Sequence, residues 1–323
     1  MKAIVQDRYG PADVLELRDV DPPEIGDGEV LVRVRAAGVD PGVWHLMTGL
    51  PYLVRIFGYG FRAPKNPVRG SDIAGVVERV GRDVTRFRPG DEVFGACGAG
   101  FAELAAATEA NLVTKPRDVP FETAAAVPTS AITALQAVRD HGRIRAGQRA
   151  LVIGAAGGVG SFAVQLAGYF GAEVTGVCST TKVDLVRSIG AADVIDYTRE
   201  DFADTGRRWD MIVDTAGNRP LSQLRRALTP DGTLVIVGGE RGGRWLAGTD
   251  RQLRAMVLSR FVGQRLTSFI AAFATEDLEL LAGLVADGAL VPVVGRTYPL
   301  AEAADAIRDL EHGRARGKLV LVV

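Results

Sequence analysis

The sequence predicts an α/β protein whose central part is a doubly wound, parallel Rossmann sheet. Three observations support this prediction. An apolar run at 150–153 leads into a glycine-rich turn and then into a largely apolar helix that ends near Gly171. Downstream, short β-branched strands alternate with helical stretches up to about residue 270. Upstream, residues 1–117 carry short strands at close intervals, which is typical of a small β-barrel.

The individual elements follow from periodicity and from turn residues. In the first region we expect strands at 2–5, 15–17, 29–35, 73–81, 89–94 and 101–105. In the central region we expect strands at 150–153, 173–178, 193–197, 211–215, 233–237 and 264–270, with helices at 129–138, 182–189, 221–228 and 251–258. The C-terminal part predicts helices at 275–286 and 301–310 and a strand at 318–323.

The turn at 154–160 has the residue types that a dinucleotide diphosphate requires. The diphosphate would lie against the first helical N–H groups, where the helix dipole is positive. Gly157 would allow close approach of the phosphates, and Gly160 would let the helix pack against the strand. Ala155 replaces the first glycine of the pattern GxGxxG, so the match is imperfect. The residues expected to bind the cofactor here are Ala156, Gly157, Gly158 and Val159.

The end of the second central strand indicates which nicotinamide coenzyme is preferred. An NAD site usually has an acid about 20 residues after the glycines, bonded to the ribose 2′-hydroxyl. This chain instead has hydroxyls and a cation at 179–182, among them Ser179 and Lys182. Hydrogen bonds to a charged group contribute roughly 1.5–3 kcal/mol each, so one or two would favour NADPH about ten- to several-hundred-fold. Alternatively, Ser179 is only a helix cap and Lys182 an incidental surface lysine.

Composition excludes several classes of function. The chain has 323 residues and a net charge of −1, which fits two domains and offers no basic tract for nucleic acid or membrane. Its two cysteines, Cys97 and Cys178, do not form a disulfide framework, and we expect a cytoplasmic protein. The N-terminal stretch lacks the apolar core of a signal peptide.

The order of several short motifs resembles the medium-chain dehydrogenase/reductase superfamily, in its zinc-independent quinone oxidoreductase-like branch. The motifs lie at 2–4, 22–32, 36–39, 70–77, 87–93, 154–160 and 313–320. The resemblance covers nearly the whole chain. It implies a GroES-like β-barrel domain formed from both chain ends, 1–117 and 275–323, beside a Rossmann NADP-binding domain at 118–274.

The resemblance also allows the zinc positions of related dehydrogenases to be read here. They match Asp40, Ser71 and Thr129. A catalytic zinc site needs Cys or His ligands at three positions, so one carboxylate and two hydroxyls do not suffice. Asp72 would match the acid behind the zinc, and we interpret it as structural. We therefore predict no metal.

Four residues are candidates for catalysis. His45 is the most plausible proton donor by its chemistry, although a histidine with only a structural hydrogen bond is an equally open interpretation. Asp40 and His45 lie in a loop expected at 39–45, after the strand at 29–35. Relatives often carry Asn near the nicotinamide at the position of Asp40, whose role is therefore open. Tyr52 and Tyr59 could donate a hydrogen bond to a carbonyl. They lie in an aromatic loop at 50–67 that forms either a wall over a flat, apolar substrate or a packing contact.

Further cofactor contacts are implied by position within the family pattern. Thr133 matches a threonine at the nicotinamide, with helix capping as the alternative. Tyr197 matches a residue at the adenosine 2′-phosphate end. Gly217 and Gly238 follow the fourth and fifth central strands, where the cofactor crosses. Lys318 matches a residue near the cofactor, although a solvated lysine remains an alternative.

Together these observations predict an NADPH-dependent, zinc-independent reductase of quinones or α,β-unsaturated carbonyls. Without a Lewis acid nothing lowers the pKa of an alcohol, whereas the π-system of a quinone or enone itself carries the developing charge. The alternatives are a zinc-free alcohol or carbonyl redox enzyme and a non-catalytic NADPH-binding redox sensor. The resemblance also implies that the strand at 264–270 lies at the sheet edge and pairs across a homodimer, and an exposed edge strand would otherwise invite uncontrolled association.

Overall fold

The computed structural model describes residues 1–52, 55–217, 219–238, 245 and 249–323. These residues form two compact units. One contains Met1–Ile132 and Phe273–Val323, and the other contains Thr133–Ala272. Each unit has its own sheet and its own hydrophobic core, so they are described in turn.

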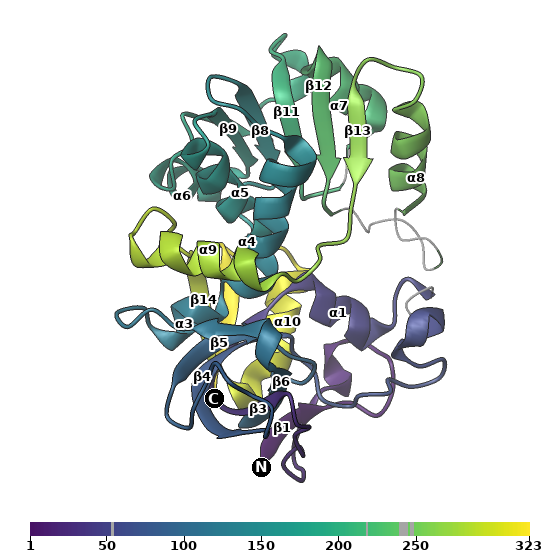
Figure 1. Cartoon of the computed structure of the whole chain (residues 1–323). Helices are drawn as coiled ribbons and strands as arrows, with labels where there is room; N and C mark the ends of the chain where they lie inside the picture. Colours follow the sequence, from purple (N-terminus) through teal and green to yellow (C-terminus); the bar gives the residue numbers. More distant parts are fainter. Residues whose placement is uncertain (53–54, 218, 239–244, 246–248) are drawn as a thin grey trace. The chain divides into compact units, whose positions relative to one another are not determined.

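The unit of residues 133–272 is built on a six-stranded parallel sheet (Figure 1). Its strands are β8 (Arg149–Ile153), β9 (Glu173–Cys178), β10 (Asp193–Asp196), β11 (Trp209–Asp214), β12 (Leu228–Ile236) and β13 (Arg265–Ser268). Their order is β10-β9-β8-β11-β12-β13, the doubly wound order of a Rossmann fold. The chain reverses direction across the sheet between β8 and β11, so the carboxyl ends of these two strands define the topological switch point.

The helices of this unit connect consecutive strands. They are α5 (Gly158–Tyr169), α6 (Val183–Ser188), α7 (Leu221–Ala227) and α8 (Thr249–Leu258), preceded by the end of α4 (Pro128–Leu135) and a π-helical segment, η4 (Gln136–Gly142). Helix α5 is largely buried, as its apolar sequence predicts. The strands contribute fully buried Leu151, Ile212 and Leu234 to the core, which is the near-continuous apolar pattern of a sheet covered on both faces.

The other unit is built from both ends of the chain and contains two sheets. Strands β1 (Lys2–Val5) and β2 (Glu16–Asp19) form a two-stranded antiparallel sheet. The larger, β-barrel-like sheet has seven strands: β3 (Glu29–Val39), β4 (Asp72–Val80), β5 (Glu92–Ala96), β6 (Leu104–Thr108), β7 (Leu112–Thr114), β14 (Val294–Pro299) and β15 (Lys318–Val322). The long strand β3 pairs with β4 and β6 and, near its end, with the C-terminal strand β15. The predicted fold class, a Rossmann sheet with a GroES-like domain, is confirmed.

Helices close this second sheet. They are α1 (Pro41–Thr48), α3 (Phe121–Ala125), α9 (Thr275–Ala286) and α10 (Ala303–Glu311). The alternating residues of β3 place Val30, Val32 and Val34 in the core, together with Leu319 and Leu321 of β15. Cross-strand burial therefore ties the C-terminal strand to the N-terminal half of the chain.

Several expectations about local structure were wrong; among them, the strand expected at 89–94 begins only at Glu92. The stretch that follows β3 is not a loop but helix α1, because Asp40 caps its N-terminus and Pro41 occupies its first turn. The segment at 50–67 is not wholly irregular, since a π-helical turn, η2, spans Arg55–Tyr59. The strand expected at 101–105 begins later, at Leu104, because the preceding residues form isolated bridges and bends instead.

Candidate active site

The glycine turn after β8 has the geometry of an anion-binding helix start. Gly157 is the N-cap of α5 and, as a glycine, provides no side-chain cap for the amides of the first helical turn. Those N–H groups have no intrahelical acceptor. A Cβ on Gly157 would meet only the Gly154 carbonyl oxygen, at 3.3 Å, whereas one on Gly160 would lie 2.1 Å from that same oxygen. Gly160 therefore serves helix packing, and Gly157 leaves an open approach to the amides.

The ends of β11 and β12 converge on the same turn. The Thr215 hydroxyl donates to the Ile153 carbonyl at 2.8 Å. Gly217 N–H donates to the Asp214 carboxylate at 2.9 Å, and a Cβ on Gly238 would lie 2.5 Å from the Thr215 carbonyl oxygen. The structure thus brings Gly217 and Gly238 to the carboxyl edge beside the glycine turn. Gly239, which follows in the sequence, lies outside the described residues.

A buried ion pair that the sequence did not predict holds these strand ends. Arg251 of α8 donates to the Asp214 carboxylate at 2.8 Å, to the Arg219 carbonyl at 2.9 Å and to the Gly238 carbonyl at 3.2 Å. Asp214 is fully buried. One guanidinium thereby joins the loop after β11 to the loop after β12. No sequence pattern around Arg251 predicts this ion pair, because the contact depends on how helix α8 packs.

The end of β9 gathers the residues expected to discriminate NADPH from NADH. Ser179 makes no capping hydrogen bond, and Lys182 follows one turn later. Half-exposed Tyr197 donates its N–H to the Cys178 carbonyl at 3.0 Å, which places it beside Ser179. The nearest acid on the adjacent strand, Asp196, accepts from the Thr180 hydroxyl at 2.6 Å, and hydrogen bonding lowers its pKa.

Thr133, the expected nicotinamide contact, belongs to helix α4 rather than to a strand end and is partly buried. The helix continues through the π-helical segment, whose last residues precede β8. The structure therefore places Thr133 on a different element from the residues of the carboxyl edge.

In the barrel unit, Asp40 has a structural role. One carboxylate oxygen caps α1 by accepting from Gly42 N–H at 2.8 Å and Val43 N–H at 3.4 Å. The other accepts from the Ser71 hydroxyl at 3.0 Å. Asp40 is 3% exposed, and its oxygens are engaged by three donors. Asp40 thus acts as the N-cap of α1 and ties this helix to Ser71.

His45 and the two tyrosines lie around the C-terminal end of α1. The His45 Nδ1 atom lies 2.7 Å from the Leu50 carbonyl oxygen, and because a carbonyl oxygen can only accept, Nδ1 carries a proton. The Arg55 guanidinium lies over the Tyr52 ring, with its Cζ atom 4.8 Å from the ring centre. Tyr59 is half-exposed, and its carbonyl accepts from the Tyr9 hydroxyl at 3.0 Å. Leu53 and Val54 of the aromatic loop, and the Phe57 side chain, lie outside the described residues.

Lys318 is buried rather than solvated. Its ammonium lies 3.3 Å from the Asp72 carboxylate, and both side chains are at most 2% exposed. Thr129 donates to the same carboxylate through its hydroxyl and its N–H. Burial raises the pKa of Asp72 to about 6; Lys318 opposes the rise and Asp40 adds to it. The three positions that would match a zinc site, at 40, 71 and 129, are thus occupied by hydrogen bonds to the two carboxylates.

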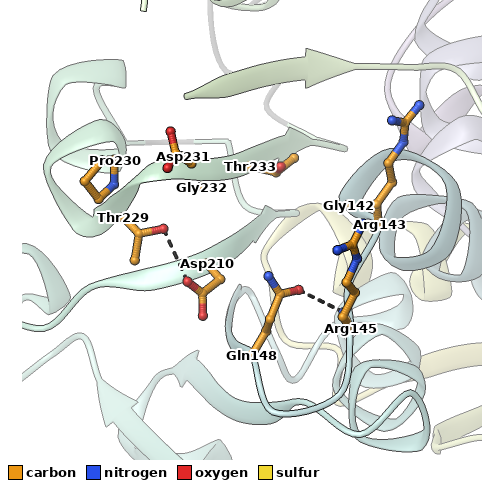
Figure 2. Close-up of a pocket in the computed structure, with 10 residues that line it drawn as sticks. All are labelled: Gly142, Arg143, Arg145, Gln148, Asp210, Thr229, Pro230, Asp231, Gly232 and Thr233. Atoms are coloured by element: carbon orange, nitrogen blue, oxygen red, sulfur yellow. Dashed lines mark hydrogen bonds between the residues drawn. The ribbon is translucent and has the colours of Figure 1, made fainter. Parts of the chain in front are cut away.

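A separate cavity of about 360 Å³ opens at the other end of the Rossmann sheet (Figure 2). Its lining includes Gln148 just before β8, Asp210 at the start of β11 and Thr233 of β12, which pairs with Met211 near the start of β11. Arg143 and Arg145 line the opposite side. These positions lie at the amino ends of the strands, whereas ligands of doubly wound sheets bind at the carboxyl ends. The cavity contains no residue of the candidate site.

Comparison with known proteins identifies the family. Residues 26–117 match the family model described as an alcohol dehydrogenase GroES-like domain, and residues 189–321 match one described as zinc-binding dehydrogenase. A quinone oxidoreductase of Pseudomonas aeruginosa is 34% identical and covers 97% of each chain. Among solved structures, an NAD-dependent alcohol dehydrogenase is 30% identical with a TM-score of 0.87 over 100% of both chains. A mycobacterial protein in complex with NADPH is 26% identical with a TM-score of 0.83, also over 100% of both chains.

The Rossmann fold, the glycines at the strand ends and these similarities identify the protein as an enzyme, an oxidoreductase of the medium-chain dehydrogenase/reductase class. Within that superfamily, the chain belongs to the quinone oxidoreductase-like family.

The residues present do not fit zinc, although one matching family model is named for it. Asp40 is the single ionisable side chain at the three matching positions, and its oxygens already cap α1 and bind Ser71. In the described part of the chain, no three His, Cys, Asp or Glu side chains cluster as a metal site would require.

Two further observations concern the environment of the protein. No helix among the described residues is long and apolar enough to cross a bilayer. Cys97 and Cys178 are free thiols, and burial raises their pKa values to about 12 and about 11. Cytoplasmic location stays a prediction.

Proposed function

We propose that the protein is an NADPH-dependent, zinc-independent reductase of quinones or α,β-unsaturated carbonyls. The main observation in support is the set of residues at the carboxyl edge of the Rossmann sheet. There, the uncapped amides of Gly158 and Val159 lie beyond β8, and Ser179 and Lys182 stand at the end of β9 where NAD enzymes carry an acid. Ala156 and Gly157 would approach the same diphosphate, with Gly217 and Gly238 beside it.

Preference for NADPH over NADH rests on charge at the end of β9. The Lys182 ammonium and the Ser179 hydroxyl are suited to a 2′-phosphate. Asp196, the acid at the end of the adjacent strand β10, is engaged by Thr180 and Thr198 and has Arg199 at 3.5 Å, so its charge is partly compensated. Tyr197 adds an exposed aromatic face for the adenosine end. The NADPH-bound mycobacterial structure supports the same choice.

The chemistry proposed needs no metal. A bound NADPH would supply the hydride, and a proton from a side chain or water would be needed to complete the reduced product. His45 would hold that proton on Nε2, because its Nδ1 proton is committed to Leu50. Tyr52 and Tyr59 would donate hydrogen bonds to the acceptor oxygen, and Lys318 would add positive charge.

The proposal is tested by following NADPH oxidation with a panel of quinones, enones and simple aldehydes. Turnover of quinones or enones without added metal supports it. Binding of NADPH without turnover of any acceptor would favour a redox sensor, and turnover of alcohols or aldehydes alone would favour a zinc-free alcohol dehydrogenase. His45→Phe should slow turnover, while His312→Phe, on the exposed C-terminal side of α10, serves as the matched control.

A homodimer through β13 is also proposed. Strand β13 pairs only with β12 among the described strands, so its other edge is unpaired. Phe261 and Ile270, which flank it, are 79% and 96% exposed, and exposed Leu253 and Val257 lie on the neighbouring α8. Such an edge favours association with a second copy. Ile270→Asp should shift the protein to monomer in sedimentation velocity, and an unchanged sedimentation coefficient would remove β13 as the interface.

A further inference from the structure

The barrel unit contains a buried cation without a counter-charge. Arg69 is 6% exposed and follows the β-bridge between Val5 and Val68. Its backbone is held on both sides, because its N–H donates to Ile4 and its carbonyl accepts from Phe101. Its guanidinium pairs with no carboxylate and donates to no acceptor within the described part of the chain, and its Nε is buried without a partner.

The other buried cations show that this is exceptional for the molecule. Buried Lys115 lies 3.0 Å from the Glu92 carboxylate and donates to three carbonyls, and buried Lys318 lies 3.3 Å from Asp72. An unpaired charge in such surroundings is costly, and burial lowers the pKa of Arg69 accordingly. The fold therefore keeps a desolvated positive charge at Arg69 without supplying its partner.

Tyr9 is the electrostatic partner of Arg69 in the barrel unit. The two side chains interact, and burial raises the pKa of Tyr9, so this phenol stays neutral. The Arg55 guanidinium stacks 4.4 Å from the Tyr9 ring centre and 4.8 Å from that of Tyr52. Arg55 also donates to the Gly49 and Thr48 carbonyls at the end of α1, so the helix dipole compensates part of its charge.

This cluster is continuous with the candidate catalytic residues of the same unit. Arg55 bonds the C-terminal turn of α1, which carries His45, and Tyr9 bonds the carbonyls of Tyr59 and Gly60. Arg55 and Tyr9 therefore tie the end of α1 to Tyr59 and Gly60, and Arg69 interacts electrostatically with Tyr9. No acid among the described residues pairs with either arginine.

We propose that Arg69, supported by Tyr9 and Arg55, binds a carboxylate carried by the acceptor that the enzyme reduces. The proposal rests on the proposed reductase function and narrows its substrate class to flat quinones or enones with an acidic group. A guanidinium offers a fork of N–H donors that matches a carboxylate in geometry and charge. The aromatic rings of Tyr9 and Tyr52 would flank the apolar part of the same molecule.

The test compares an acid with its neutral ester. The probes are (E)-4-oxo-4-phenylbut-2-enoate and its methyl ester, with NADPH oxidation as the readout. We expect kcat/KM for the acid to exceed that for the ester by at least about tenfold, through KM, since hydrogen bonds to charged groups are strong. In Arg69→Met this ratio should fall to near one with ester turnover retained, and Arg69→Lys should retain part of it. Arg8→Met, which removes an exposed arginine beside Tyr9, should leave the ratio unchanged.

A second measurement separates this inference from the reductase assignment. Calorimetric titration with the saturated acid, 4-oxo-4-phenylbutanoate, needs no turnover, and its affinity should fall at least tenfold in Arg69→Met. Failure of the reductase assignment would appear as loss of turnover for both probes while the acid still binds through Arg69. Equal kcat/KM for acid and ester in the wild-type enzyme, or a ratio unaffected by Arg69→Lys and Arg69→Met, would overturn the carboxylate site.

Discussion

Two glycines of the turn after β8 should respond to alanine in opposite ways. A Cβ on Gly160 would lie 2.1 Å from the Gly154 carbonyl oxygen, which is backbone and cannot rotate away. The helix must then move from the strand, and overpacking of this kind costs about 1–3 kcal/mol. The corresponding fall in melting temperature is roughly 2–10 °C. Gly157 has φ −85° and ψ 176°, which alanine adopts without strain, and its Cβ meets a single atom at 3.3 Å.

Gly157→Ala should therefore leave the melting temperature nearly unchanged but weaken coenzyme binding. Its methyl group would hold the diphosphate away from the amides, and the loss of one charge-assisted hydrogen bond worth roughly 1.5–3 kcal/mol raises Kd about ten- to 150-fold. Differential scanning fluorimetry and NADPH fluorescence titration measure the two effects on the same samples. If Gly157→Ala bound NADPH as the wild type does, the diphosphate would not rest on this turn, and the reasoning would fail.

Three further outcomes are expected. Lys182→Glu should raise Kd for NADPH about ten- to hundredfold and leave Kd for NADH almost unchanged, since only NADPH carries the 2′-phosphate. Arg187→Glu, within the helix α6 that follows Lys182, is the control, and equal losses for both coenzymes would exclude Lys182 as the phosphate ligand. Arg251→Met should lower the free energy of unfolding, measured in urea, by about 3–5 kcal/mol, because the buried Asp214 carboxylate would lose its ion-pair partner. A loss below about 1 kcal/mol would show that the ion pair between Arg251 and Asp214 is not needed for stability. The pKa of Asp72 is raised to about 6, so the native state holds more protons than the unfolded state between pH 4 and 6, and its contribution to stability falls as pH rises through that window. The unfolding free energy of the wild type relative to Asp72→Asn should therefore decrease by about 1–3 kcal/mol from pH 4 to 6, and a flat difference would contradict the assignment.

Elements with strong local signals were predictable from the sequence. Strand β9 and helix α9 occur at the predicted residues, because apolar runs bounded by glycine or by a change of period report directly on burial. The signals failed where a single polar residue decided the local structure. Asp40 was interpreted as a possible catalytic group in a loop, yet it caps a helix, and capping depends on the backbone of residues that follow it.

The sequence by itself determined the fold class, the family and the glycine turn, since these depend on residue type and short spacing along the chain. Only the tertiary structure decided which charges meet. Arg251 pairs with Asp214, which is 37 residues away in the sequence, and Lys318 pairs with Asp72, which is 246 residues away. Arg69 is buried without any carboxylate partner among the described residues. Such pairings depend on how separate elements pack, because the energy of a buried charge is set by neighbours in space rather than along the chain.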